Sequence, residues 1–312
     1  MTKKKKKVFI TGGTGLLGHY LLKAAPVAFD LRCTYFPEFK KDSIVHECVK
    51  FPVDMCNETA VSAAIQEAAP AYIVHTASIA NVDYIEKNKE EARRTNVGGL
   101  KNIMAACRKS RSKLIYISSN AIFDGNNPPY REEDVPHPLS YYGSLKVEEE
   151  GMLKASGLEF SIVRPILMYG WNLAVERQNP VTWLIDALKA NKPVKMVDDI
   201  FCNPLYARDC ADVIWKIIEL GKDGVFHVGG KDEISRYDFA CITAEVFGLN
   251  KALISPVKNS FFKDIAPRPV NTTYCIDKIK NELDITPSGI REGLEKMKGE
   301  KHNGNKHRTQ GS

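Results

Sequence analysis

Two residues one helical turn apart, Tyr142 and Lys146, are well suited to move a proton. They lie in the segment SYYGSLKVEEE (140–150). Positions i and i+4 share a helix face, so the lysine ammonium neighbours Tyr142, while Tyr141 is paired with Leu145. A phenol with a pKa near 10 is a poor proton donor and acceptor at neutral pH, and a nearby ammonium favours its phenolate. The same pair would also suit a solvated helix surface, so its chemistry depends on other segments.

Ser118 and Ser119 are the next candidates, because they end the apolar run KLIYISS (113–119). This run predicts a strand, and ligands of open α/β sheets bind at the carboxyl ends of strands. We expect one of these two serines to donate a hydrogen bond to a substrate carbonyl, while Tyr142 passes the proton. A nicotinamide that passes the hydride would complete a site for carbonyl reduction or alcohol oxidation. A serine in this place also serves often as a turn or helix-capping residue.

A glycine-rich segment, VFITGGTGLLGHYLL (8–22), joins a predicted strand to a predicted helix. Spaced glycines in such a turn let the backbone approach a pyrophosphate at the positive end of the helix. With the preceding threonine they satisfy the pattern T-G-x-x-G-x-x-G, which is rarer than G-x-G-x-x-G. A tight turn with close helix packing is the alternative explanation. We predict a dinucleotide site whose cofactor-binding residues here are Gly12, Gly15, Leu16, Leu17 and Gly18.

The cofactor is predicted to be NAD or NADP, and the sequence does not separate the two. The acidic residue that usually binds the ribose follows the second strand. The corresponding segment LRCTYFPEFKK (31–41) offers only Glu38, which lies beyond a proline. Asp54, in FPVDMCN, is placed to reach the adenine amino group, although a turn aspartate explains it equally well. Ala77, in VHTAS (74–78), is expected to lie along the cofactor.

The order of the apolar runs predicts an α/β fold. Short β-branched runs alternate with longer helical patterns, which is typical of a Rossmann-type doubly wound parallel sheet with a smaller carboxy-terminal substrate lobe. The runs are KVFITGG, GHYLLKAAP, LRCTYF, ETAVSAAIQEAA, AYIVHTAS, VGGLKNIMAACRKS and KLIYISS, followed by LEFSIVRPI and GVFHVGG. We assign the NAD(P)-binding domain to 7–170, its sheet completed by about 204–230, the substrate lobe to 171–203 and 231–298, and a disordered tail to 299–312.

Composition limits the classes of protein. A chain of 312 residues with 44% hydrophobic and 26% charged residues suits one or two soluble domains. The net charge of +6 includes the run Lys3 to Lys7, so we expect a solvated amino-terminal tag and no nucleic-acid partner. The 8 cysteines form no C-x-x-C pair, and no metal is predicted. No apolar run reaches the roughly 18 residues of a membrane span, and a cytoplasmic protein is expected.

The segments TGGTGLLG, SSNAIFDG, YYGSLK and RPILMYG together resemble the extended short-chain dehydrogenase/reductase family over nearly the whole chain. The dTDP-4-dehydrorhamnose reductase branch is the most similar, through NPPYREEDVPHPLSYYG, NPLYARDCADVI and APRPVNTTYCIDK. The resemblance implies catalytic roles for Ser119, Tyr142 and Lys146, with Lys146 also holding the nicotinamide ribose. It implies an NAD(P)-dependent oxidoreductase that reduces the 4-keto group of a nucleotide-activated sugar, and a homodimer built from helices that flank the tyrosine helix.

Two departures from the family pattern bear on the reaction. Members that dehydrate the sugar carry an acidic pair where this chain has Asn120 and Ala121, so a 4,6-dehydratase is not expected. Rhamnose-forming reductases resemble RTSWVYG where this chain reads RPILMYG, with Leu167 in place of the tryptophan, which leaves the sugar open. One alternative is a nucleotide-sugar 4-epimerase, which retains its cofactor. The same branch contains the regulatory beta subunit of methionine adenosyltransferase, so a non-catalytic NAD(P)-binding regulatory subunit is the other alternative.

Five further side chains have weaker claims to function. Arg164, in SIVRPI, and Arg268, in APRPV, have the chemistry to bind a diphosphate, and ion pairs within the protein explain them equally well. His75 and His227 fall in strand patterns and are expected to be hydrogen-bonded core or edge residues. Asn96, in TNVGG, is expected to tie strands together through its amide.

Overall fold

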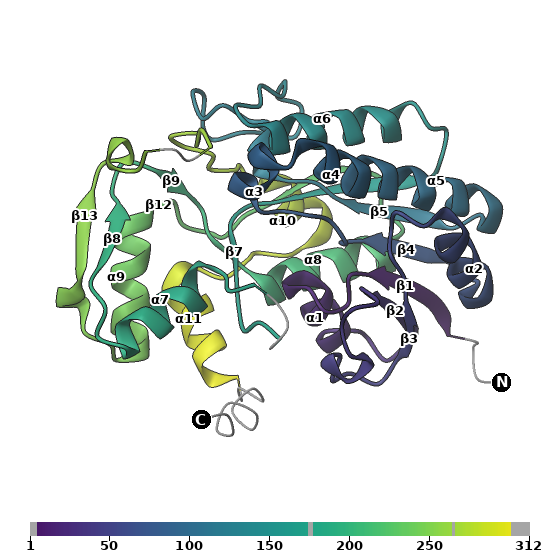
Figure 1. The fold of residues 1–312 in the computed structure, drawn as a ribbon, viewed down its shortest axis with the longest axis horizontal. Helices are drawn as coiled ribbons and strands as arrows, with labels where there is room; N and C mark the ends of the chain where they lie inside the picture. The colour runs from purple at the N-terminus through teal and green to yellow at the C-terminus, as the bar shows by residue number, and fades with distance from the viewer. Residues whose placement is uncertain (1–4, 174–176, 264–265, 301–312) are drawn as a thin grey trace.

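A computed structural model of the chain describes residues 5–173, 177–263 and 266–300. It shows a large sheet layered between helices, with a smaller lobe beside it that is made of later segments (Figure 1). The α/β class and the doubly wound parallel sheet expected from the sequence are confirmed.

Within the described residues, the central sheet has 7 parallel strands in the order β11-β6-β5-β4-β1-β2-β3. The chain passes from β1 to one side through β2 and β3, and then resumes on the other side at β4. This reversal marks the edge where open α/β sheets bind ligands. The bounds are β1 (Lys6–Thr11), β2 (Phe29–Tyr35), β3 (Val49–Pro52), β4 (Tyr72–His75), β5 (Lys113–Ile117), β6 (Phe160–Pro165) and β11 (Gly224–Val228).

Helices cover both faces of the sheet. Side chains alternate along a strand, so Val8 and Ile10 of β1 join the core cluster that includes α1 and α8, whereas Phe9 joins the cluster of α2 and α5. Helix α6 lies on the same side as α5 (Figure 1). The bounds are α1 (Leu16–Lys23), α2 (Glu58–Ala68), α3 (Val82–Lys87), α4 (Lys89–Arg93), α5 (Gly99–Ser110), α6 (Tyr141–Lys154) and α8 (Ala207–Leu220).

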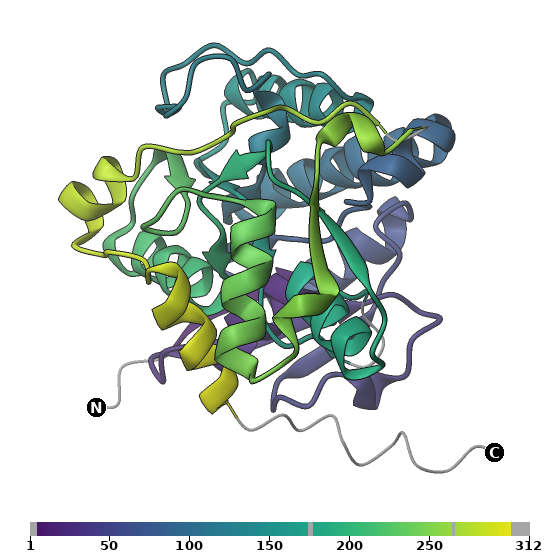
Figure 2. The same cartoon turned by 90° about the vertical axis from the view of Figure 1, so that its left-hand side faces the viewer.

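In the smaller lobe, α7 and α9 pack on the parallel pair β8–β13, and α11 lies beside α9 (Figure 2). Its core is a separate buried cluster made of Leu184, Leu188, Val194, Ala240, Ala244 and Ile254. The short pairs β7–β10 and β9–β12 lie between this lobe and the sheet (Figure 1). The bounds are α7 (Pro180–Lys189), α9 (Arg236–Phe247), α11 (Ile290–Gly299), β7 (Met168–Tyr169), β8 (Val194–Val197), β9 (Phe201–Cys202), β10 (Leu205–Tyr206), β12 (Ile234–Ser235) and β13 (Ile254–Val257).

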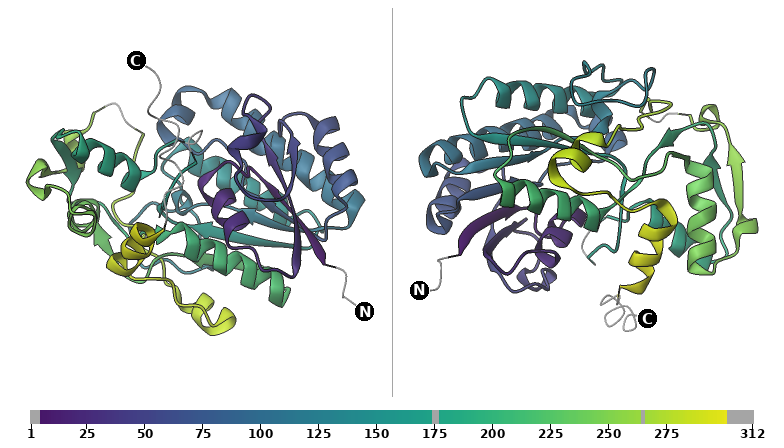
Figure 3. Two further views of the ribbon diagram at one scale, coloured as in Figure 1. Left: turned by 90° about the horizontal axis from the view of Figure 1, so that it is seen from below. Right: turned by 180° about the vertical axis from the view of Figure 1, so that it is seen from behind.

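The structure places two segments differently from the domain boundaries that we assigned from the sequence. Helix α10 (Asp277–Leu283), assigned to the lobe, packs against β11 and α8, because its buried Ile279 and Leu283 join the main core (Figure 3). Helix α11 continues to Gly299, and Glu300 makes side-chain contacts, so the expected tail does not begin at 299. Its remainder, 301–312, lies outside the described residues, as do Lys3 and Lys4.

Glu300 ties the end of α11 to the sheet domain. The hydroxyls of Tyr20 on α1 and Tyr206 on β10 donate to its carboxylate at 2.8 and 2.6 Å, and Lys23 Nζ lies 3.1 Å away. Tyr20 Oη also accepts the Trp171 N–H at 3.0 Å. Burial, followed by the charge of Glu300, raises the pKa of Tyr20, so its hydroxyl stays a donor.

We expect Glu300→Ala to lower the free energy of unfolding by about 2 kcal/mol, because hydrogen bonds to charged groups contribute roughly 1.5–3 kcal/mol. Urea denaturation measures the change. Glu295, which is exposed on the same helix, is the matched control, and Glu295→Ala should stay within about 0.5 kcal/mol of the parent. Equal stabilities of the two variants would contradict the contact.

Candidate active site

The glycine loop turns directly from β1 into α1. Gly12 has a φ of +70°, and its carbonyl accepts the Gly15 N–H at 3.0 Å, while Gly13 N–H donates to the Thr34 carbonyl at 2.8 Å. A Cβ at Gly18 would overlap the carbonyl oxygen of Gly12, so glycine there lets the helix sit close on the loop. The predicted cofactor-binding glycines therefore share one compact turn.

The amino end of α1 suits an anion. Gly15 occupies the N-cap position and brings no side chain to it, and the first turn carries no acidic residue. The first backbone N–H groups of a helix have no partner within the helix, and the helix dipole favours negative charge there. Leu16 and Leu17 thus present backbone N–H groups where the sequence predicts a pyrophosphate.

Thr11 links the glycine loop to the end of β4. Its hydroxyl oxygen accepts the N–H groups of Thr76 and Ala77, both at 3.1 Å, and its O–H is left to donate to His75 Nδ1 at 2.9 Å. A Cβ at Gly12 would lie 3.1 Å from Ala77 Cα, so Ala77 lies directly beside the loop. Ala77 is therefore brought to the predicted cofactor site.

The region predicted to hold the adenosine lies at the ends of β2 and β3. β2 ends at Tyr35, followed by the exposed Phe36. Thr34 Oγ1 accepts the Gly12 N–H at 3.0 Å, which ties the end of β2 to the glycine loop. Asp54 is half-buried after β3, and its Oδ1 accepts the Cys56 N–H at 2.9 Å, as a turn aspartate does. The geometry therefore does not separate NAD from NADP.

Ser118 and Ser119 follow β5 but make different contacts. Ser118 Oγ donates to the buried Glu150 at 2.6 Å and so belongs to the interior. Ser119 Oγ accepts the Ala121 N–H at 3.2 Å, capping a short turn (Asn120–Ile122), and has a long contact of 3.4 Å to Asn120 Oδ1. Of these two serines, Ser119 is therefore the one whose O–H makes only a long hydrogen bond within the described structure.

Helix α6 brings Tyr142 next to that turn. Ser140 caps the helix by accepting the Gly143 N–H at 3.2 Å. A Cβ at Gly143 would overlap the Ala121 carbonyl, so the first turn of α6 rests against the residues that follow Ser119. Tyr142 is 7% exposed and Lys146 is 1% exposed, and the Lys146 ammonium lies 5.8 Å from the centre of the Tyr142 ring. The structure thus brings the three predicted catalytic residues to one edge of the sheet.

Lys146 is held from the sheet side as well. Its ammonium donates to Tyr116 Oη at 2.8 Å and to the Ile117 carbonyl at 3.2 Å, and Glu149 Oε2 lies 3.2 Å away. Tyr116 in turn donates to Glu149. Burial alone would lower the pKa of Lys146, but Glu149, and then Tyr142, outweigh it and raise that pKa above its ordinary value. The ammonium therefore stays charged inside the protein.

The two arginine candidates are paired within the protein. Arg164 is 1% exposed and donates two hydrogen bonds to the Glu150 carboxylate, through Nε at 2.8 Å and Nη2 at 2.6 Å. Its Nη1 also lies 3.0 Å from His227 Nε2, which accepts because Nδ1 faces the Tyr130 carbonyl. Arg268 binds Asp83 of α3 at 2.8 Å. The ion-pair explanation therefore accounts for both arginines.

His75 and His227 have the structural roles expected of them, whereas Asn96 ties a loop and not the strands that the sequence suggested. Burial, and then a nearby cation, lowers the pKa of each histidine to about 3, the cation being Lys146 for His75 and Arg164 for His227. Asn96 exchanges two hydrogen bonds with the backbone of Ile79, at 2.8 and 2.9 Å, and so fixes the loop after β4.

Sequence reasoning missed three residues that surround Lys146: Tyr116, Glu149 and Glu150. The glutamates stand three and four positions after Lys146, a spacing that places charged side chains on the same helix side. The spacing was therefore a usable signal for the pair. Tyr116 left no comparable signal, because an aromatic residue within a strand is usually a packing residue.

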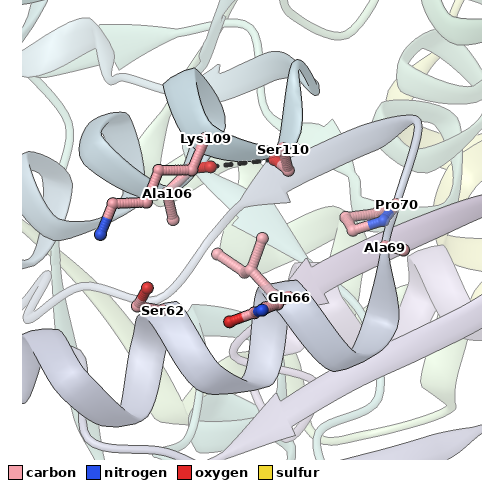
Figure 4. Close-up of a pocket in the computed structure, with 8 residues that line it drawn as sticks. Ser62, Gln66, Ala69, Pro70, Ala106, Lys109 and Ser110 are labelled. Carbon is pink, nitrogen blue, oxygen red and sulfur yellow. Dashed lines mark hydrogen bonds between the residues drawn. The ribbon is translucent and has the colours of Figure 1, made fainter.

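A separate pocket of about 330 Å³ lies between the carboxyl ends of α2 and α5 (Figure 4). Its residues Ala69 and Pro70 precede β4, and Ser110 precedes β5. Because the strands are parallel, this pocket lies at the opposite edge of the sheet from Ser119 and the glycine loop. In the part of the chain that the structure describes, no group of three His, Cys, Asp or Glu side chains is placed to hold a metal ion, and no helix is long and apolar enough to cross a bilayer.

Comparison with known families assigns the chain to one group. The family described as RmlD substrate binding domain matches residues 6–302. The chain belongs to this family. It is an NAD(P)-binding family within the extended short-chain dehydrogenases/reductases, the group that the motifs resemble.

Two kinds of protein are among the relatives of this chain. Methionine adenosyltransferase 2 subunit beta of Bos taurus is 31% identical, over 93% of this chain and 87% of that protein. dTDP-4-dehydrorhamnose reductase of Aggregatibacter actinomycetemcomitans is 28% identical, over 79% of this chain and 86% of that protein. The crystal structure of dTDP-4-dehydrorhamnose reductase from Bacillus anthracis in complex with NADP matches with a TM-score of 0.80 and 27% identity, over 94% of this chain and 98% of that one. The chain is thus similar both to a reductase and to a subunit of methionine adenosyltransferase.

The buried neutral ring of His75 should make stability depend on pH. Its folded-state pKa lies below the ordinary 6.5, so the unfolded chain binds more protons below pH 6.5, and stability is lost as the pH falls. Between pH 7 and pH 5 the free energy of unfolding should fall in both proteins. We expect the fall to be about 2 kcal/mol smaller in His75→Asn than in the parent. Urea denaturation at both pH values measures this, with the exposed His137→Asn as the control. An unchanged dependence in His75→Asn would contradict the assignment.

Proposed function

We propose that the protein is an NAD(P)-dependent oxidoreductase that reduces the 4-keto group of a nucleotide-activated sugar. The dTDP-4-dehydrorhamnose reductases among its relatives support this proposal, since one covers 79% of the chain and another was solved with NADP. The observation that carries the proposal is the seating of α6 against the turn after β5, which gathers Ser119, Tyr142 and Lys146 at the sheet edge that also holds the glycine loop.

The residues of the loop fit a dinucleotide. Gly12, Gly15 and Gly18 leave no side chain between the loop and a pyrophosphate, and the amino end of α1 has no side-chain cap to displace. When bound, the reduced nicotinamide supplies the hydride. Ala77 and the backbone after β4 would line its path toward Ser119.

The chain's own residues supply the proton and the orientation. The Ser119 O–H, whose contact to Asn120 Oδ1 is long at 3.4 Å, would donate to the substrate carbonyl oxygen and hold that oxygen near Tyr142. Tyr142 would give its phenolic proton to the same oxygen as the carbonyl becomes an alcohol. The Lys146 ammonium stabilises the resulting phenolate and is within the same buried site, where electrostatic interactions are strong. The low exposure of both residues keeps water from competing for the proton.

A second candidate function has a specific observation in its favour. Methionine adenosyltransferase 2 subunit beta proteins match about 93% of the chain at 30–31% identity. On this hypothesis the protein would bind a nicotinamide dinucleotide and hold a partner enzyme, with no turnover of its own. Fold does not distinguish the two functions, because the same scaffold serves both.

Identification of the bound cofactor tests the proposal. The purified protein is denatured, the released nucleotide is identified by mass spectrometry, and the emptied protein is titrated with NADH and NADPH. Reversible binding followed by turnover of a dTDP-, UDP- or GDP-4-keto-sugar would support the reductase. Stoichiometric NAD that survives purification would indicate an epimerase. Reversible binding with no turnover, together with a co-purifying partner enzyme, would indicate the regulatory subunit.

Tyr142→Phe should abolish turnover while NADPH affinity changes little, because the ring keeps its packing and only the transferable proton is lost. A loss of at least about 100-fold in kcat is expected. Tyr141→Phe is the matched control, since this neighbour faces away from Lys146 and should retain activity. Full activity of Tyr142→Phe would exclude the mechanism.

Lys146→Met should weaken both turnover and NADPH binding. The substitution keeps the length and apolar stem of the side chain but removes the charge that stabilises the phenolate and binds the ribose. Stopped-flow turnover and fluorescence titration measure the two effects. Lys154→Met, on the same helix but half-exposed, should leave both unchanged. A defect in turnover with unchanged nucleotide affinity would contradict the ribose contact.

A further inference from the structure

Glu149 is a buried carboxylate for which the mechanism above has no use. It stands three residues after Lys146 on α6, and the side chains of both residues are 1% exposed. Its Oε2 lies 3.2 Å from the Lys146 ammonium. A carboxylate taken out of water is costly unless it is paired, so this contact needs an explanation beyond packing.

Tyr116 of β5 bridges the same two residues. Its hydroxyl accepts from Lys146 at 2.8 Å and donates to Glu149. Burial, and then the charge of Glu149, raises the pKa of Tyr116 well above its ordinary value, so the phenol keeps its single proton. That proton is committed to Glu149, which leaves the oxygen free to accept from Lys146. The ammonium is thereby held from the sheet as well as from its own helix.

The other charged groups around Lys146 are already engaged or neutral. Glu150, also on α6, is bound by Arg164 at 2.6 Å and by Ser118 at 2.6 Å. His75 on β4 is neutral near pH 7, because its pKa is about 3. Tyr116 and Tyr142 are the remaining titratable neighbours. Among the groups that the structure places around Lys146, Glu149 is therefore the carboxylate that acts as its counter-ion.

We propose that Glu149 is a positioning residue for the reaction, which keeps Lys146 charged and fixed beside Tyr142 through a direct ion pair and through Tyr116. This inference rests on the proposed function for its catalytic consequence. Burial disfavours an ammonium, so without the counter-charge Lys146 releases its proton at a lower pH than in the parent. The neutral amine then stabilises neither the phenolate of Tyr142 nor the contact with a bound ribose.

Glu149→Gln tests the inference, because glutamine keeps the size and an acceptor for Tyr116 but carries no charge. NADPH affinity, measured by fluorescence from pH 7 to pH 9, should change little in the parent and fall about tenfold in the variant, one pKa unit corresponding to a factor of ten. The kcat for a keto-sugar should show the same alkaline loss. Identical pH profiles for parent and variant would overturn the proposal.

Glu148→Gln is the matched control. Glu148 is the preceding residue, half-exposed and bound to Arg93 at 2.6 Å on the surface, so its variant should follow the parent at every pH. Tyr116→Phe is a second test that keeps both charges. It should shift the alkaline loss in the same direction by less than Glu149→Gln does, because it removes the bridge and leaves the ion pair. No shift in Tyr116→Phe would contradict the bridging role.

A readout without ligand separates failure of the inference from failure of the proposed function. In Glu149→Gln the pKa of Lys146 in the folded protein should be depressed. The folded variant then binds fewer protons at this residue than the unfolded chain does. The free energy of unfolding of the variant should therefore fall relative to that of the parent as the pH falls from 10 to 7. A purely structural defect would give a difference that does not vary with pH, and would overturn the inference. If the parent turns over no keto-sugar while this dependence is present, the counter-ion role stands and the reductase proposal fails.

Discussion

The buried carboxylates beneath α6 are the constraint on which the site depends. Glu149 and Glu150 are 1% and 2% exposed, and charges with so little water are tolerated only with partners in good geometry. Glu150 finds Arg164 on β6 and Ser118 after β5, whereas Glu149 finds Tyr116 on β5 and Lys146 on its own helix. These pairs hold α6 at one rotation and one height against the sheet. The position of Tyr142 follows from that placement.

The sheet brings the other parts to the same edge. Because the strands are parallel, the glycine loop after β1 and the turn after β5 both lie at the carboxyl edge, with the end of β4 between them. Thr11 couples the glycine loop to the end of β4 through the backbone of Ala77. The glycine at 18 then lets α1 start close to the loop. The predicted dinucleotide site and the proposed proton-transfer site are thus two regions of one continuous edge.

Relatives of both kinds, a reductase and methionine adenosyltransferase 2 subunit beta, extend over most of this chain, so the scaffold alone does not select between the two proposed functions. The difference between these functions depends on what the edge residues do to a bound ligand. A charged Lys146 beside an intact tyrosine favours chemistry. The lobe built around β8 and β13 lies beside the sheet domain. That lobe is joined to the sheet domain by Glu300, whose three contacts place α11 against α1 and β10.

The sequence by itself determined the α/β class, the glycine loop and the pairing of Tyr142 with Lys146, because these depend on periodicity and spacing within single segments. Only the tertiary structure decided which glutamates of the run 148–150 turn inward. Glu148 meets Arg93 at the surface while the next two are buried, a choice set by the rotation of α6 against β5 and β6. It also decided that Arg164 pairs with Glu150, and that α10 packs on β11. These partners are distant in the chain, and spacing within one segment carries no information about which distant surfaces will exclude water together.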